Sequence, residues 1–147
     1  MKTREISRIV PDATALKALA HPVRLRMLGM LRIDGPATAT RLAERLGLNS
    51  GATSYHLRQL AQHGFIEEAP DQPSRRDRWW RARHESTSFF EPGATEEQFD
   101  SNVAFAQAAL TEQVNVMQRA QDEFVGLPPD WQATTQISDF TMAMTVE

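Results

Sequence analysis

Three side chains that suit contact with nucleic acid lie close together between residues 50 and 62: Ser54, Tyr55 and Arg58. An arginine guanidinium can form paired hydrogen bonds with guanine or grip a phosphate, and hydroxyl groups can donate to base or phosphate oxygens. The sequence shows no glycine-rich phosphate loop and no convincing Ser-His-Asp set, and it has no cysteine. The chemistry that these residues favour is therefore binding to DNA and not catalysis.

The helical spacing of the residues on its inner side predicts a helix from Ser50 to Gln62, and this helix positions the three side chains. Its inner stripe consists of Thr53, Leu57 and Leu60. Either Asn49 or Ser50 can cap its first turn with a side-chain oxygen. With the inner stripe turned towards the core, the three side chains named above face outward, where they could enter a major groove.

A shorter helix, residues 39–46, precedes this one, and Gly47 supplies the left-handed residue that stops it. Ala43 is the small residue that a helix-turn-helix needs where its two helices touch. A helix over residues 23–34 and a short helix capped by Asp12 come before this pair. The four predicted helices together indicate a small helical domain.

The period changes from helical to extended after these helices. Residues 65–69 and 78–83 are predicted to form two strands of a hairpin, joined by a charged, turn-rich loop. Trp79 and Trp80 should point to opposite faces of the second strand, one to the core and the other towards the linker or a later helix. The predicted fold class is therefore mainly α with a small antiparallel β-hairpin, a winged helix-turn-helix.

We expect the N-terminus of the helix and the wing arginines to contact DNA as well, because a helix N-terminus favours a phosphate and arginines can enter a minor groove. The predicted DNA-binding residues are Ser50, Gly51, Thr53, Ser54, Tyr55, His56, Arg58, Arg75, Arg76 and Arg78. Simpler roles stay open for three of them. Tyr55 can cover the wing with its ring, His56 can form a structural hydrogen bond, and Arg58 can be a solvated charge.

Charge divides the chain into two parts. Residues 1–84 carry 15 Lys and Arg against 8 Asp and Glu, whereas residues 85–147 carry 1 against 11. A basic part suits a polyanion, and an acidic part should face away from it. The expected organisation is a DNA-binding domain over residues 1–84, starting with a loose arm over residues 1–10, followed by a linker, a long helix and a tail over residues 85–147.

The long helix is predicted from about Glu96 to Phe124, and residues 95–98 fit a capping box at its start. An apolar stripe with spacing close to that of a coiled coil runs along it: Phe99, Val103, Ala106, Leu110, Val114 and Met117. We interpret this stripe as a dimerisation face. The alternatives are a helix that packs back across its own domain, and dimerisation through residues 13–20. Alternating apolar residues in the tail, Phe140, Met142 and Met144, indicate a strand, and a truncated C-terminus stays open.

Three segments resemble the ArsR/SmtB family of bacterial winged-helix regulators: ALAHPVRLRMLGML, ATRLAERLGLNSGATSYHLRQLAQHGFIEE and RRDRWWRAR. The resemblance covers about residues 13–84. It implies a homodimer that binds operator DNA and usually represses transcription. The family's DNA-reading segment falls on residues 50–58 of this chain, and the quartet from Ser54 to Leu57 matches its most recognisable stretch.

This chain departs from the metal sensors of that family, since it has no cysteine and its long helix has no histidine. His21, His56, His63 and His84 lack the spacing of metal ligands. We therefore expect no metal, no cofactor and no enzyme activity, and leave open a small-molecule effector. No apolar run is long enough for a membrane span, so a cytoplasmic protein is expected. The alternative function is a winged-helix module that binds protein without operator binding.

Overall fold

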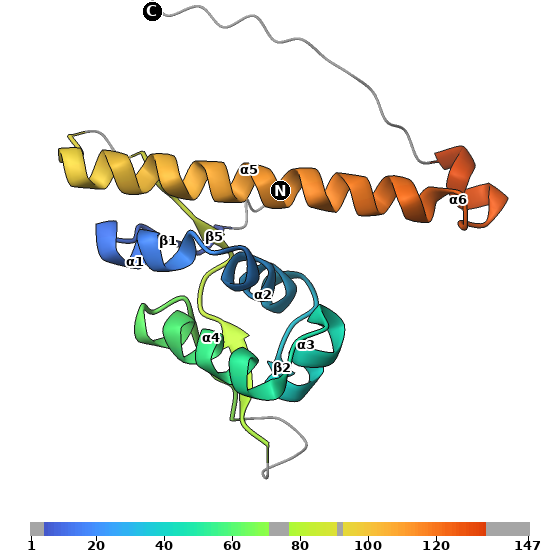
Figure 1. Cartoon of the computed structure of the whole chain (residues 1–147), viewed down its shortest axis with the longest axis horizontal. Coiled ribbons are helices and arrows are strands. Elements are labelled where there is room, and N and C mark those ends of the chain that lie inside the picture. The colour runs from blue at the N-terminus through green and yellow to red at the C-terminus, as the bar shows by residue number, and fades with distance from the viewer. Residues whose placement is uncertain (1–4, 71–76, 91–92, 135–147) are drawn as a thin grey trace, which may run out of the picture. The chain divides into compact units, whose positions relative to one another are not determined.

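The computed structural model describes residues 5–70, 77–90 and 93–134. Two compact units divide the chain, residues 1–112 and 113–147. The helices are α1 (Ala13–Leu19), α2 (Pro22–Ile33), α3 (Ala39–Leu46), α4 (Ser50–Gln62), α5 (Glu96–Phe124) and α6 (Pro129–Thr134), and the strands are β1 (Arg8–Ile9), β2 (Ala37–Thr38), β3 (Ile66–Glu68), β4 (Trp79–Ala82) and β5 (Ser86–Thr87) (Figure 1). The predicted bounds of α3, α4 and α5 are confirmed. The tail from Phe140 to Met144, predicted as a strand, lies outside the described residues.

Side-chain caps fix where the first four helices begin. The caps are Asp12, His21, Thr38 and Asn49, each of which accepts a hydrogen bond from a backbone N–H in the first turn. These bonds satisfy donors that have no partner within the helix. The turn between α3 and α4 closes on Gly47, which has a φ of 65° and is therefore in the left-handed region that favours glycine. The two helices of the helix-turn-helix are thus set by local sequence.

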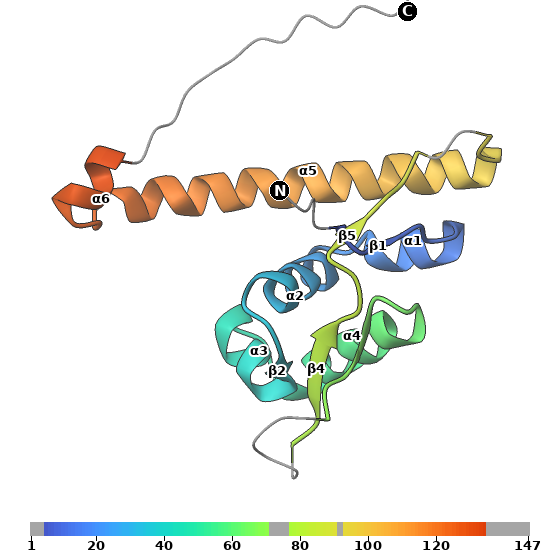
Figure 2. The ribbon, with the colours of Figure 1, turned by 180° about the vertical axis from the view of Figure 1, so that it is seen from behind.

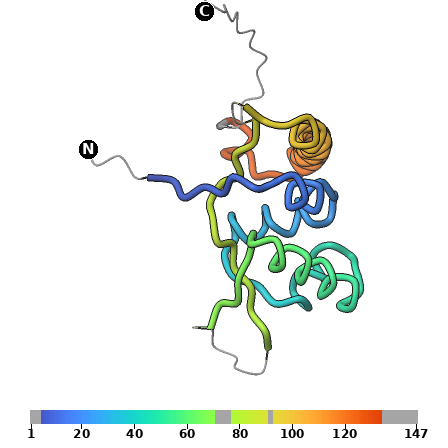
Figure 3. Tube along the Cα trace, turned by 90° about the vertical axis from the view of Figure 1, so that its left-hand side faces the viewer, coloured from blue at the N-terminus to red at the C-terminus, as the bar shows by residue number. Residues whose placement is uncertain are grey.

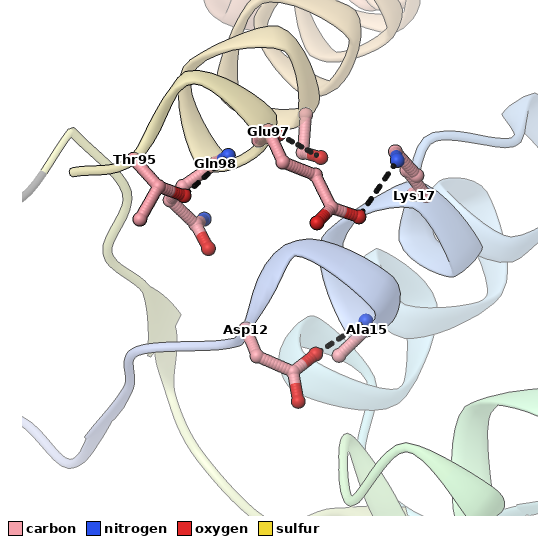
Figure 4. A network of polar contacts seen from close by, with 7 residues as sticks. Asp12, Ala15, Lys17, Thr95, Glu97 and Gln98 are labelled. Atoms are coloured by element: carbon pink, nitrogen blue, oxygen red, sulfur yellow. Dashed lines mark hydrogen bonds and ion pairs between the residues drawn. The ribbon is translucent and has the colours of Figure 1, made fainter.

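Polar contacts fix the start of α5 against α1 (Figure 4). Thr95 Oγ1 accepts a hydrogen bond from the backbone N–H of Gln98 at 3.2 Å, which confirms one half of the predicted capping box. The Gln98 side chain turns to Asn102 instead of bonding back to the cap. Lys17 Nζ of α1 lies 3.3 Å from Glu97 Oε1, so an exposed ion pair joins the two helices.

A three-stranded sheet with the order β2-β4-β3 forms the wing, and all its pairings are antiparallel. Figure 3 shows β3 and β4 side by side. These two strands confirm the predicted hairpin. The third strand, β2, was not predicted, because it has only two residues and carries no alternation of apolar and polar side chains.

The two tryptophans of β4 point to opposite faces, as the strand period requires. Trp80 belongs to the hydrophobic core, as predicted for one of the pair. Trp79 is also buried, but the Arg41 guanidinium of α3 lies over its ring at 4.7 Å from the centroid. The sequence suggested the linker or the long helix as the neighbour of the second tryptophan; the contact that the structure gives for its ring is this cation from α3.

Two residues of the N-terminal arm, Arg8 and Ile9, form a strand, where the sequence predicted a loose segment. Arg8 and Ile9 pair in parallel with Ser86 and Thr87 of β5. Arg32 of α2 holds the same region, since its Nε donates to the His84 carbonyl and its Nη2 to Thr87 Oγ1, both at 2.9 Å. The chain that leaves the wing is thus held between the arm and α2.

One hydrophobic core is shared by the helices α1, α2, α3 and α4, the wing and the first part of α5. Its buried members are Ala15, Leu16, Leu19, Met27, Leu28, Leu31, Leu42, Leu57, Leu60, Phe65, Ile66, Trp80 and Phe105. Phe105 comes from α5, and Phe89 and Ala109 pack against the same core. The first compact unit therefore extends to Glu112, past the expected domain boundary at residue 84. No helix in the described part of the chain is both long and apolar enough to cross a membrane.

The cap of α4 gives a stability prediction. Asn49 Oδ1 accepts a hydrogen bond from the Ala52 N–H at 2.8 Å, and Asn49→Ala removes it. We expect the free energy of unfolding to fall by about 1 kcal/mol, which is the usual cost of losing such a cap. Urea unfolding followed by circular dichroism measures the change. Asn49→Asp keeps a capping oxygen and should match the wild type; an equal loss in both variants would contradict the assignment of the cap.

Candidate nucleic-acid interface

The two sides of α4 differ in exposure as the sequence predicts. Thr53 and Leu57 are fully buried and Leu60 is 1% exposed, so this stripe packs on the core. The opposite side carries Tyr55, which is 52% exposed, and the exposed Arg58. A helix that buries one stripe in this way leaves its other side free to enter a groove.

Thr53 corrects the predicted set of DNA contacts. Its side chain is fully buried, and its Oγ1 donates to the Asn49 carbonyl at 3.0 Å. A hydroxyl that is buried and already bonded cannot reach DNA. The prediction that Thr53 contacts DNA is therefore wrong, and its role is to hold the first turn of α4.

The N-terminal turn of α4 is open to solvent. Ser50 and Gly51 are both exposed there, next to the Asn49 cap. A Cβ at Gly51 would come within 3.3 Å of Asn49 Oδ1, so glycine leaves the cap undisturbed. The remaining backbone N–H groups of this turn suit an anion.

Three of the predicted contacts line one cleft. Ser54 and Arg58 from α4 and Arg78 from the base of the wing surround it, together with Thr40 from the first turn of α3. The cleft has a volume of about 310 Å³, and the elements that bound it, α3, α4 and β4, can be followed in Figure 2. Thr40 was missed from the sequence, because nothing in a single hydroxyl on α3 indicates that it lies opposite α4. The predicted wing-tip residues Arg75 and Arg76 lie outside the described residues.

Arg78 is held in place at the edge of this cleft. Its guanidinium lies over the ring of the buried Trp80 at 5.8 Å from the centroid, and its Nε lies 3.1 Å from Glu68 Oε1. Both members of this ion pair are well exposed, so the pair adds little to stability. Its effect is to orient a cation towards solvent.

A second group of polar side chains surrounds His56, on the side of α4 that faces the start of α2. The ring of His56 lies 4.7 Å from the ring of His21 and 5.5 Å from that of Tyr55, measured between centroids. Arg24 donates to the Ala18 carbonyl, and its positive charge acts on the His56 imidazole. The sequence did not indicate this cluster, because two of its members lie some thirty residues from the other two. The ring of Tyr55 packs edge-on against that of His56.

Burial lowers the pKa of His56 below 6.5, and the nearby Arg24 charge lowers it further. Burial likewise lowers the pKa of His21, again with a contribution from Arg24. His21 Nδ1 accepts a hydrogen bond from the Val23 N–H at 3.2 Å, so its proton is on Nε2 in the neutral form. His56 Nδ1 is buried without a hydrogen-bond partner among the described residues. Both imidazoles are therefore neutral in the folded protein at neutral pH.

These two pKa shifts make stability depend on pH. Well above pH 6.5 both histidines are neutral whether the chain is folded or not. As the pH falls below 6.5, the unfolded chain binds protons before the folded protein does, so the free energy of unfolding should fall. We expect the double variant His21→Asn, His56→Gln to lose less stability between pH 7.5 and pH 5.5 than the wild type, as measured by urea unfolding at each pH.

Asparagine at position 21 can still cap α2, so this variant removes the titration and keeps the cap. His63→Gln, at the other end of α4, is the matched control and should keep the pH dependence of the wild type. An unchanged pH dependence in the double variant would show that the cluster does not cause it.

The described residues include no group of three or more His, Cys, Asp or Glu side chains arranged to hold a metal ion. The charged groups around the cleft are the guanidinium groups of Arg58 and Arg78 and the carboxylates of Asp77 and Glu68. The guanidinium groups bind anions and do not by themselves carry out covalent chemistry.

Comparison with known proteins gives three findings. Residues 19–69 match the family described as a helix-turn-helix domain. The chain is 39% identical over 59 residues to the HTH-type transcriptional regulator YgaV of Escherichia coli (strain K12), which covers 40% of this chain and 60% of YgaV. It is 44% identical over 54 residues to the HTH-type transcriptional regulator NmtR of Mycobacterium tuberculosis (strain ATCC 25618 / H37Rv), which covers 37% of this chain and 44% of NmtR. The matches thus span less than two thirds of either relative.

A solved structure with a similar arrangement is the homodimeric winged helix-turn-helix DNA-binding domain of Mb0332 from Mycobacterium bovis, described as a possible ArsR-family regulator. It is 22% identical, and the alignment covers 76% of this chain and 80% of that one with a TM-score of 0.43.

The predicted winged helix-turn-helix is confirmed by the observed helices and strands and by the family match. Residues 19–69 thus match a helix-turn-helix domain, and the chain is similar in sequence to two bacterial HTH-type transcriptional regulators.

Proposed function

We propose that the protein is a homodimeric transcription regulator that binds operator DNA and represses transcription. The observation that carries this proposal is the outer face of α4, where Tyr55 and Arg58 are exposed within a domain whose sequence relatives are transcriptional regulators. An α-helix fits the major groove of B-DNA, and its outward side chains read the base edges. The protein would act by binding and not by catalysis, in the cytoplasm where bacterial DNA lies.

Three parts of the surface support the DNA-binding role. The exposed first turn of α4 offers backbone N–H groups to a phosphate, and Tyr55 is available to the base edges. The wing brings Arg78 next to the same helix. The charge of residues 1–84 is of the sign that attracts DNA, whereas that of residues 85–147 is of the sign that DNA repels.

The exposed side of α5 supports the dimer. Phe99, Val103 and Leu110 are exposed, with Leu110 at 62%, although Phe105 on the opposite side of the helix is buried in the core. The first part of α5 therefore does pack back on its own domain, but through a different face from the predicted stripe. The spacing of this stripe resembles a coiled-coil seam, and an identical stripe on a second copy would cover it.

These surfaces suggest separate roles for the two parts of the chain. Residues 1–84 would bind DNA, and residues 85–147 would contribute the dimer face, to which Val114 and Met117 add exposed apolar side chains. A dimer places two copies of α4 on one side of a duplex, with half-sites about one helical turn apart.

Binding to DNA gives the first functional prediction. Full-length protein incubated with a pool of random duplexes should enrich a preferred sequence with two-fold symmetry. The affinity for that duplex, measured by fluorescence anisotropy, should fall about a hundredfold between 50 mM and 200 mM salt if roughly four phosphates are contacted, because each contact releases counterions. No binding to any duplex at 50 mM salt would exclude the proposed function and favour a module that binds protein.

The proposed dimer face gives the second functional prediction. Leu110→Glu places a charge on the exposed stripe, and light scattering should then report monomers, with operator affinity lowered at the same time. Because Leu110 is largely exposed, its replacement should not unfold the domain. Ala104→Glu is the matched control, since Ala104 is exposed on α5 about a third of a turn away from the stripe. A dimer that persists in Leu110→Glu would place the interface elsewhere, such as at residues 13–20.

A further inference from the structure

The cleft between α3, α4 and the base of the wing has walls that donate hydrogen bonds. Ser54 and Arg58 lie one turn apart on α4 and so face the cleft together, while Thr40 faces it from the first turn of α3. Arg78 completes the set from the wing. Besides Thr38, whose hydroxyl already caps α3, two hydroxyl groups and two guanidinium groups thus line a single space of about 310 Å³, together with the Asp77 carboxylate.

The two arginines differ in what they already contact. Arg78 is held by the Trp80 ring and by Glu68, as described above. Arg58 is exposed and forms no ion pair or hydrogen bond within the described ranges, so its donors are available to a ligand. Carboxylates also lie nearby, since Asp77 lines the cleft and Glu68 pairs with Arg78. A ligand of the cleft must therefore be an anion that competes well for guanidinium groups, and phosphate does so by accepting paired hydrogen bonds.

We propose that this cleft binds one backbone phosphate of the operator, on the strand that separates the major groove holding α4 from the minor groove next to the wing. The proposal rests on the function proposed above. A helix in the major groove and a wing at the adjacent minor groove lie on either side of one phosphodiester strand, which must cross the gap between them. The cleft is that gap, and its donors come from both of its sides.

This placement assigns Arg58 to the DNA backbone and not to a guanine. Its neighbours in the cleft, Thr40 and Arg78, come from elements that flank the major groove and do not enter it. A contact to phosphate positions the protein on the duplex without reading sequence. Base reading is then left to the first turn of α4 and to Tyr55.

The test uses full-length protein and the enriched duplex, with single phosphates replaced in turn by neutral methylphosphonates. Wild-type affinity at 100 mM salt should fall about tenfold at one position in each half-site. Arg58→Gln should bind the unmodified duplex about tenfold more weakly, lose sensitivity at that same position, and lower the slope of log affinity against log salt by about 0.9 per lost contact. Its preference among single base-pair variants should equal that of the wild type.

Two further variants serve as a control and as an independent test of the cleft. Arg45→Gln removes the same charge from α3 outside this cleft, where Arg45 pairs with Asp34 at 2.8 Å, and it should keep the position-specific sensitivity. Thr40→Val removes only a hydroxyl and should reduce the sensitivity at the position that Arg58→Gln abolishes.

The outcomes separate the two proposals. If the wild type binds no duplex, the proposed function fails and this inference fails with it. If the wild type binds but Arg58→Gln keeps its sensitivity at every phosphate, or changes the preference at one base pair, the cleft proposal alone is overturned.

Discussion

The burial of one side of α4 is the constraint on which the interface depends. Leu57 and Leu60 lie in the core with almost no exposed surface, and each such side chain contributes about 1.5–3 kcal/mol by leaving water. A rotation of the helix about its axis would expose them, so the outward direction of Tyr55 and Arg58 is fixed by packing. The Thr53 hydroxyl, bonded to the Asn49 carbonyl, adds a directional contact that apolar packing cannot supply. The same contacts that stabilise the core therefore also fix which side of α4 faces outward.

The same packing also decides what the wing can do. Trp80 belongs to the core and fixes the register of β4, while its ring carries the Arg78 guanidinium. Trp79, on the other face of the strand, is covered by Arg41. Two consecutive tryptophans of one strand thus contact two arginine side chains, one on each face of the strand. Since β4 pairs with both β2 and β3, the two rings that these cations contact are positioned by a sheet and not by a loop alone.

The elements that could be predicted from the sequence are those with a repeated pattern of apolar residues or with a clear capping or terminating residue. Helix α4 has a buried stripe and a cap, and α3 ends at Gly47, so their bounds followed from the residues themselves. The two-residue strands β1, β2 and β5 have no such pattern and form only because tertiary contacts bring partners alongside. For the same reason the sequence could not show that His21 meets His56, or that Thr40 lies opposite Arg58. The mistaken assignment of Thr53 arose from proximity in sequence to exposed residues, although its place on the inner stripe indicated burial.

Helix α5 shows how the two roles proposed for this protein, DNA binding and dimerisation, can share one element. Its buried side packs Phe105 against the core and is joined to the helical domain by two ion pairs, Lys17 with Glu97 and Arg26 with Glu112 at 3.5 Å. Its opposite side carries exposed apolar side chains, among them Phe99, Val103 and Leu110. A helix that is fixed to the core on one side and pairs with a second copy on the other would transmit the geometry of the dimer to α2, whose first turn contacts α4 through the two histidine rings. The separation of the two α4 helices on DNA would then be set by how two copies of α5 pack, because within each copy α5 and α4 contribute to the same hydrophobic core and are linked through α2.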